Sequence, residues 1–145
     1  MSLRYVVDQF KRLGAFCRKK RGVEVYECWY GDVRARIDRE KIRISATIGE
    51  LRLEYLHTYP IELEDVEESI ERATNADRAW IDYEAYPPIT LELEFKLPEK
   101  LSDALKTFRT LIEKNLGMNI THFNAEIRFY KEGEPIEFNE WIKEF

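Results

Sequence analysis

Apolar and polar residues alternate through most of the stretch 33–57, and this pattern predicts more about structure than any other part of the chain. The apolar members of the alternation are Val33, Ala35, Ile37, Ile42, Ile44, Ala46, Ile48, Leu51, Leu53 and Tyr55. Successive side chains of a strand point to opposite faces, so a period of two predicts three strands, each with one buried and one wet face. The polar breaks at 38–40 and 49–50 are short, which favours antiparallel hairpins over parallel strands.

Four other segments carry apolar residues at steps of three and four, the period of a helix with one buried face. We expect helices over about 3–18, 63–75, 101–116 and 138–145, with Gly22 and Gly117 as stop signals. Apolar patterning elsewhere predicts strands over 23–30, 80–86, 89–97 and 123–129, and turns at 87–88 and 131–135.

The predicted elements follow the order α-β-β-β-β-α-β-β-α-β-α. We therefore predict an α+β fold: a single domain, residues 1–145, with a curved and mostly antiparallel sheet of about seven strands. The helices are expected to pack mainly on one face of this sheet. A chain of 145 residues is long enough to bury a sizeable core.

Charged residues make up 35% of the chain, and Gln9 is its only glutamine, a composition typical of hyperthermophile proteins. No apolar run approaches the roughly 20 residues of a membrane helix. Asp8 and Gln9 interrupt the first apolar stretch, which a secretory signal would not allow. We expect a cytoplasmic protein that binds no membrane.

Cys17 and Cys28 are the only cysteines, and their spacing fits no metal-ligand pattern. We predict two buried thiols, the usual state of free cysteine, with a disulfide as the alternative that a hyperthermophile cytosol tolerates. His57 and His122 are expected at the surface, since two histidines alone are too few ligands for a zinc site.

Positive charge is concentrated at the beginning of the chain. Residues 1–43 hold 12 Lys and Arg against 6 Asp and Glu, a net of +6, whereas residues 44–145 hold 11 against 22, a net of −11. This asymmetry favours an anionic partner for the first part, or head-to-tail self-association. The candidate nucleic-acid-binding residues are Lys11, Arg12, Arg18, Lys19, Lys20, Arg21, Arg34, Arg36 and Arg43. The alternative is a solvated face whose arginines are neutralised by nearby acids such as Asp32 and Asp38.

Tyrosine and tryptophan are numerous for a core of this size. These side chains combine an apolar body with a polar tip, which suits partner surfaces and ligand pockets. The candidate partner-binding or ligand-binding residues are Tyr26, Trp29, Tyr30, Tyr59, Trp80, Tyr83 and Tyr86. The alternative is an aromatic core whose hydroxyl groups reach water.

Carboxylates gather on the hairpin predicted from strands 80–86 and 89–97. Asp82 lies on the first strand, and Glu94 and Lys96 lie two residues apart on the second, hence on one face. An aspartate followed by Glu-x-Lys on the next strand, and then by a helix, resembles the metal site of restriction-nuclease-like enzymes over about residues 77–116. The resemblance implies that the acids hold a divalent cation and that the lysine steadies the attacked phosphate. The alternative is cross-strand charge pairing, worth about tenths of a kcal/mol per pair.

No Ser or Cys stands in a nucleophile context and the sequence has no Gly-rich phosphate loop, so a binding protein is favoured over an enzyme. The leading hypothesis is a non-enzymatic binding domain that forms a homodimer and contacts a protein partner, without cofactor or metal. A nucleic-acid-binding domain and a metal-dependent nuclease-like enzyme are the alternatives.

Overall fold

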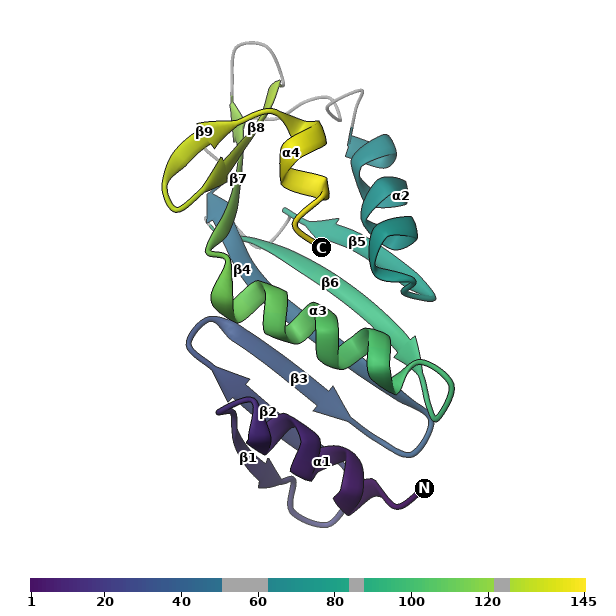
Figure 1. Cartoon of the computed structure of the whole chain (residues 1–145). Coiled ribbons are helices and arrows are strands. Elements are labelled where there is room, and N and C mark those ends of the chain that lie inside the picture. Colours follow the sequence, from purple (N-terminus) through teal and green to yellow (C-terminus); the bar gives the residue numbers. More distant parts are fainter. Residues whose placement is uncertain (51–62, 84–87, 122–125) are drawn as a thin grey trace.

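The computed structural model describes residues 1–50, 63–83, 88–121 and 126–145 (Figure 1). Within this part, four helices accompany nine strands, which form a six-stranded and a three-stranded antiparallel sheet. The predicted α+β class with antiparallel pairing is therefore confirmed. The strands are more numerous than the seven expected, and three of them form a second sheet.

The helices are α1 (Leu3–Arg12), α2 (Leu63–Thr74), α3 (Leu101–Glu113) and α4 (Phe138–Ile142). The strands are β1 (Phe16–Lys19), β2 (Tyr26–Tyr30), β3 (Val33–Ile37), β4 (Lys41–Glu50), β5 (Arg78–Asp82), β6 (Pro88–Lys96), β7 (Leu116–Thr121), β8 (Glu126–Lys131) and β9 (Glu134–Ile136). Among the described residues, no helix is long and apolar enough to cross a membrane.

The six-stranded sheet has the order β1-β2-β3-β4-β6-β5. Its strands bury the apolar residues that alternate with polar ones in the sequence. In β3 the side chains of Val33, Ala35 and Ile37 are buried while the arginines between them are exposed. The same period buries Ile42 and Ile44 in β4, and it continues through β6. One face of the sheet therefore belongs to the hydrophobic core.

Helices α1, α2 and α3 cover that apolar face (Figure 1). Helix α1 packs against β1, β2 and β3, α3 lies over β3, β4 and β6, and α2 packs against β5. An edge-to-face contact between Phe10 and Phe108, with ring centroids 5.1 Å apart, joins α1 to α3. No described helix lies on the opposite face of the sheet, which carries the polar side of the alternation.

The first helix ends at Arg12, so the predicted helix over 3–18 is too long. Ser2 caps its beginning by accepting a hydrogen bond from the Tyr5 amide, and Gly14 adopts a φ of +98° just after its end. The chain then enters β1 at Phe16, and Gly22 lies in the turn after β1 rather than at a helix end. The apolar spacing from Phe10 to Cys17 happens to continue the helical period, and this coincidence misled the prediction.

The two cysteines are joined, so the prediction of two buried thiols is wrong. Strand β1 pairs with β2 in a register that places Cys17 directly opposite Cys28, and the two sulfur atoms form a disulfide. The bond attaches a four-residue edge strand to the rest of the sheet.

The second sheet, in the order β7-β8-β9, contains two strands that the sequence analysis did not predict. Helix α3 ends at Glu113, and Asn115, with a φ of 47°, turns the chain so that Leu116 begins β7 instead of ending the helix. Glu132 and Gly133, both with positive φ, make a tight turn, and β9 starts directly after it.

The two sheets meet where β4 ends. A bulge interrupts the β4–β6 register between Thr47 and Gly49. A Cβ atom at Gly49 would overlap the main-chain carbonyl oxygen of Met118 in β7. Glycine is therefore the residue that lets β7 approach the backbone of β4 this closely.

Several predictions concern residues outside the described part of the chain. They are the strand containing Leu51, Leu53 and Tyr55, the end of the strand over 80–86, the beginning of the strand over 123–129, and the positions of His57 and His122.

Candidate functional site

The face of the six-stranded sheet opposite the helices, called the open face below, carries a compact set of charged and aromatic side chains. Paired residues in neighbouring strands share a face, so the register defines its rows. One row contains Phe16, Trp29, Arg34, Ser45, Glu92 and Trp80. The next row contains Arg18, Glu27, Arg36, Arg43, Glu94 and Arg78. Lys41 and Lys96 lie beyond the second row, and Thr47, Thr90 and Asp82 lie beyond the first.

Among the described strand positions of the open face, basic side chains outnumber acidic ones by seven to four, although the whole chain has a net charge of −5. The basic members are Arg18, Arg34, Arg36, Lys41, Arg43, Arg78 and Lys96, and the acidic members are Glu27, Asp82, Glu92 and Glu94. The open face therefore carries a local positive charge on an acidic protein.

Arginines surround a shallow depression in the centre of the open face. The depression has a volume of about 330 Å³ and is lined by Glu27, Arg34, Arg36, Arg43, Ser45 and Glu92. A second depression, of about 240 Å³, adjoins it and is lined by Arg36, Asp38, Lys41 and Arg43. Arg34 and Arg36 are exposed, and neither makes an ion pair with any residue that the structure describes.

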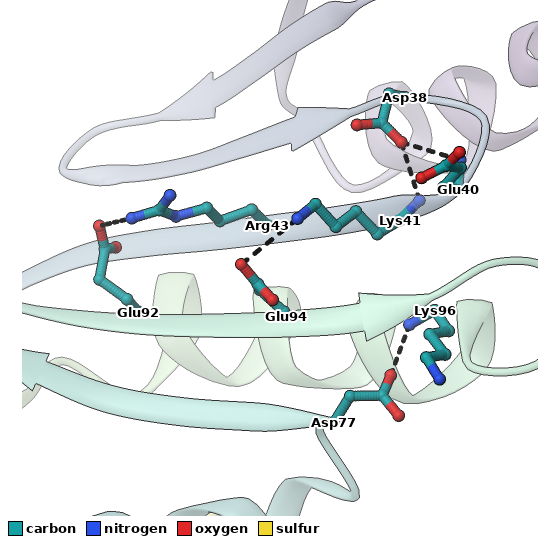
Figure 2. A network of polar contacts seen from close by, with 8 residues as sticks. All are labelled: Asp38, Glu40, Lys41, Arg43, Asp77, Glu92, Glu94 and Lys96. Carbon is teal, nitrogen blue, oxygen red and sulfur yellow. Dashed lines mark hydrogen bonds and ion pairs between the residues drawn. The ribbon is translucent and has the colours of Figure 1, made fainter.

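Two ion pairs link β4 to β6 beside these depressions (Figure 2). The Nη2 atom of Arg43 lies 3.2 Å from Oε1 of Glu92, and the Nζ atom of Lys41 lies 3.6 Å from Oε1 of Glu94. Glu92 is only 8% exposed, and its second carboxylate oxygen is buried without a hydrogen-bond partner among the described residues. The ion pair with Glu92 holds the Arg43 side chain, which runs along β4 in Figure 2.

The hairpin turn between β3 and β4 is closed by Asp38, which lies at one edge of the second depression. Its Oδ1 atom accepts hydrogen bonds from the main-chain N–H groups of Glu40 and Lys41, at 2.8 and 2.9 Å (Figure 2). This side chain-to-backbone pattern is typical of a tight turn. It fixes the start of β4 and therefore the positions of Lys41 and Arg43.

Aromatic rings lie at both ends of the first row. The rings of Phe16 and Trp29 pack with centroids 5.0 Å apart, and Phe16 is 62% exposed. At the other end, the guanidinium groups of Arg43 and Arg78 lie over the ring of Trp80, at 4.9 and 4.2 Å from its centroid. Such cation–π contacts keep the guanidinium groups near the sheet surface.

The structure brings only part of the predicted basic set together. Arg18, Arg34, Arg36 and Arg43 lie on the open face, as the alternation indicates. Lys11 and Arg12 lie at the end of α1, on the other side of the sheet. Lys19 points to the helix-covered side because it alternates with Arg18, and Lys20 and Arg21 follow β1 in the turn.

The predicted aromatic set is divided in the same way. Trp29 and Trp80 lie on the open face, whereas Tyr26 and Tyr30 point to the helix-covered side, where the Tyr30 ring lies over Gly14. Tyr83 follows β5 and is half-buried against the core. Tyr59 and Tyr86 fall outside the described residues.

Asp82, Glu94 and Lys96 do not converge. Asp82 lies opposite Thr90, whereas Glu94 lies opposite Arg78, so four residues, or about 13 Å of strand, separate the two acids. Glu94 instead pairs with Lys41, and the Lys96 main-chain N–H donates to Asp77 at 2.7 Å (Figure 2). Within the described ranges, no group of three or more His, Cys, Asp or Glu side chains is arranged to hold a metal ion.

Asp77 anchors the end of the open face that holds Lys96. Besides accepting from the Lys96 amide, it forms an ion pair with the Lys100 Nζ at 3.0 Å. Burial raises the pKa of Asp77, but the hydrogen bonds from Lys100 and Lys96, with their charges, outweigh it, so the pKa lies below its usual range. The Asp77 carboxylate is therefore ionised, and it links the start of β5 to the end of β6 and to Lys100.

Sequence reasoning missed several members of the open face. Phe16 falls within the helix predicted over 3–18, and neither Lys41 nor Arg78 is among the predicted basic residues. The place of Arg78 on this face depends on the strand order β4-β6-β5. The local signal for Phe16 was the alternation of Phe16, Cys17 and Arg18, which fits a strand equally well.

Comparison of the chain with models of protein families, with curated proteins and with solved structures finds no match. The assignment of function therefore rests on the residues and their geometry.

Proposed function

We propose that this protein is a non-enzymatic binding domain whose open face holds a polyanionic partner. The observation that carries the proposal is the group of Arg34, Arg36 and Arg43 around the central depression. Two of these three guanidinium groups make no ion pair with described residues, so they are available to an anion. Arginine is well suited to this role because its planar fork binds phosphate or carboxylate with two hydrogen bonds.

The cross-strand register supports the proposal further. Arg36 lies directly opposite Arg43, and Lys41 lies directly opposite Lys96. Like charges in such positions destabilise a sheet, so stability alone does not favour this arrangement. A bound polyanion would attract both members of each pair and would offset the repulsion between them.

Self-association is the second candidate, and it is favoured by the separation of charge in the chain. The outer side of α2 carries the exposed acids Glu64, Asp65 and Glu68, while the open face of another copy would offer arginines. A homodimer or larger oligomer formed in this way would dissociate as salt rises. Light scattering at low and high salt therefore distinguishes it from a monomer that binds a separate polyanion.

The disulfide restricts the cellular compartments in which the protein is expected. Disulfides persist in oxidising compartments and in the cytosol of hyperthermophiles. The charge-rich composition, 35% Asp, Glu, Lys and Arg, supports the second setting, so we propose a cytoplasmic location.

Charge reversal on the two faces of the sheet tests the proposed function. We expect the wild-type protein to bind inorganic polyphosphate or single-stranded DNA at low salt, with an affinity that falls as salt rises. The double variant Arg34→Glu/Arg36→Glu should lose about tenfold or more in affinity, measured by titration calorimetry. The matched control, Lys11→Glu/Arg12→Glu, changes the net charge equally on the far side and should lose at most about threefold.

Two results would contradict this proposal. One is the absence of binding to either polyanion by the wild-type protein at low salt. The other is an equal loss of affinity in the two double variants, because binding would then follow net charge and not the open face.

A further inference from the structure

We infer that the polyanion is a single-stranded nucleic acid whose bases stack on the aromatic side chains at the ends of the open face. This inference rests on the proposed function and names the class of its ligand. It is carried by the aromatic residues, which a partner recognised by charge alone would not need.

Phe16 is the most informative of these residues. Phe16 is 62% exposed on a sheet face that is rich in charged side chains, so its ring contributes little to the core. Trp29 supports its ring at 5.0 Å, and the Arg18 guanidinium lies 5.7 Å from the Trp29 centroid. An exposed ring held by a second ring, with a cation beside it, is a suitable platform for a base joined to a phosphate.

The far end of the row offers a second platform of a different kind. Arg78 and Arg43 lie over Trp80 at 4.2 and 4.9 Å, so planar guanidinium groups cover this ring. Unstacked bases pack on arginine planes as well as on aromatic rings. The same arginines can contact a phosphate, which places base and backbone recognition side by side.

The distance between the two platforms fits a short single strand. Phe16 in β1 and Trp80 in β5 are separated by five strand spacings, or about 24 Å at roughly 4.8 Å each. At about 3.4 Å per nucleotide of a stacked strand, this distance spans about seven nucleotides. Arg34 and Arg36, both on β3, lie between the platforms, where the phosphates of such a strand would pass.

Single-stranded nucleic acid fits this face better than the other polyanions. A duplex hides the faces of its bases, and no described helix lies on the open face to enter a groove. A sulfated polysaccharide or inorganic polyphosphate would use the arginines but has no aromatic ring to stack on the exposed ring of Phe16.

The test compares ligands of matched charge that differ in their bases, and it adds a duplex whose bases are paired. A labelled ten-nucleotide single strand is competed by an abasic strand of the same length, by a duplex and by inorganic polyphosphate of matched charge. We expect the base-bearing strand to bind about tenfold or more tighter than the abasic strand, measured by fluorescence anisotropy.

A pair of aromatic variants completes the test. Phe16→Ala should weaken binding of the base-bearing strand about fivefold or more, and should leave the affinity for polyphosphate unchanged. Tyr5→Ala is the matched control, because Tyr5 is 52% exposed but lies on α1, on the other side of the sheet. Both residues are largely exposed, so neither variant removes a core side chain.

The outcomes separate the two proposals. Equal binding of base-bearing and abasic strands, no effect of Phe16→Ala, or tighter binding of the duplex would overturn the inference while leaving the polyanion proposal standing. A protein that binds none of these ligands at low salt would overturn both. Base-dependent binding that Phe16→Ala weakens and Tyr5→Ala does not would support both.

Discussion

Gly49 is the single residue on which the arrangement of the two sheets depends most directly. Its α-carbon lies against the main-chain carbonyl of Met118, and this neighbour is backbone, which cannot rotate away as a side chain could. Any side chain at this position must push β4 and β7 apart.

We therefore expect Gly49→Ala to destabilise the protein by about 2–3 kcal/mol or more, since overpacking that moves backbone is expensive. Urea denaturation followed by circular dichroism measures this loss. Thr47→Ala, on the same strand but exposed, is the control and should change stability little. Wild-type stability in Gly49→Ala would show that β4 and β7 do not approach so closely.

The Glu67 carboxylate accepts a hydrogen bond from a main-chain N–H group at the edge of the sheet. The outer strand β5 presents the Ile81 amide, which donates to the Glu67 Oε2 on α2 at 2.7 Å. Burial raises the pKa of Glu67 above its usual value of 4.5; the hydrogen bond from Ile81 opposes this, and Glu64 adds to it. Ionised Glu67 therefore disfavours the folded state relative to the protonated form.

This shift predicts a pH-dependent effect of Glu67→Gln, whose side-chain oxygen can still accept from Ile81. Because the pKa is raised in the folded state, the stability linked to protonated Glu67 is complete below the unfolded pKa and is lost as pH rises through the folded pKa. The variant should thus melt at a higher temperature than the wild type at pH 7, and the difference should vanish below about pH 4. A variant that is less stable than the wild type at pH 7 would contradict the shift.

At the scale of elements, β1 depends on its covalent link. It is four residues long, lies at the edge of the sheet and is joined to β2 through Cys17 and Cys28, which are 11 residues apart. Closing a loop of this length in the unfolded chain corresponds to a stabilisation of about 2–3 kcal/mol.

Reduction of the disulfide should therefore lower the free energy of unfolding by about that amount, as measured by denaturation with and without a thiol reductant. The double variant Cys17→Ser/Cys28→Ser should match the reduced protein and should not respond to reductant. If reductant shifted this variant as well, or left the wild type unchanged, the assigned link would be wrong.

Long regular patterns predicted their elements well, and short ones did not. Apolar residues alternate through β3, β4 and β6, and they form stripes along α2 and α3. Each of these patterns spans several residues, so the buried face can be identified from the sequence. In β7 the alternation of Leu116, Met118 and Ile120 was equally regular, but Leu116 also fitted the stripe of the preceding helix. Pairing with β8 decides between the two, and pairing is not a local property.

At the scale of the whole molecule, the candidate site could be predicted only in part. The alternation indicated that Arg34, Arg36 and Arg43 share a wet face, and the sheet confirms that placement. The addition of Trp80 and Arg78 to the same face depends on the strand order β4-β6-β5, which joins residues far apart in the sequence. The same register separates Asp82 from Glu94, which sequence proximity had grouped.

The central claim is that the open face is the binding surface, and the three tryptophans of the chain report on it directly. Trp29 and Trp80 lie on the open face, whereas Trp141 is fully buried against Phe129 in the packing of α4 on β8. The indole N–H groups give separate signals in a ¹H–¹⁵N spectrum of the labelled protein. Addition of a ten-nucleotide single strand should move the signals of Trp29 and Trp80 and leave that of Trp141 in place. If the strand binds and only the Trp141 signal moves, or none of the three does, the binding surface lies elsewhere and the account is wrong.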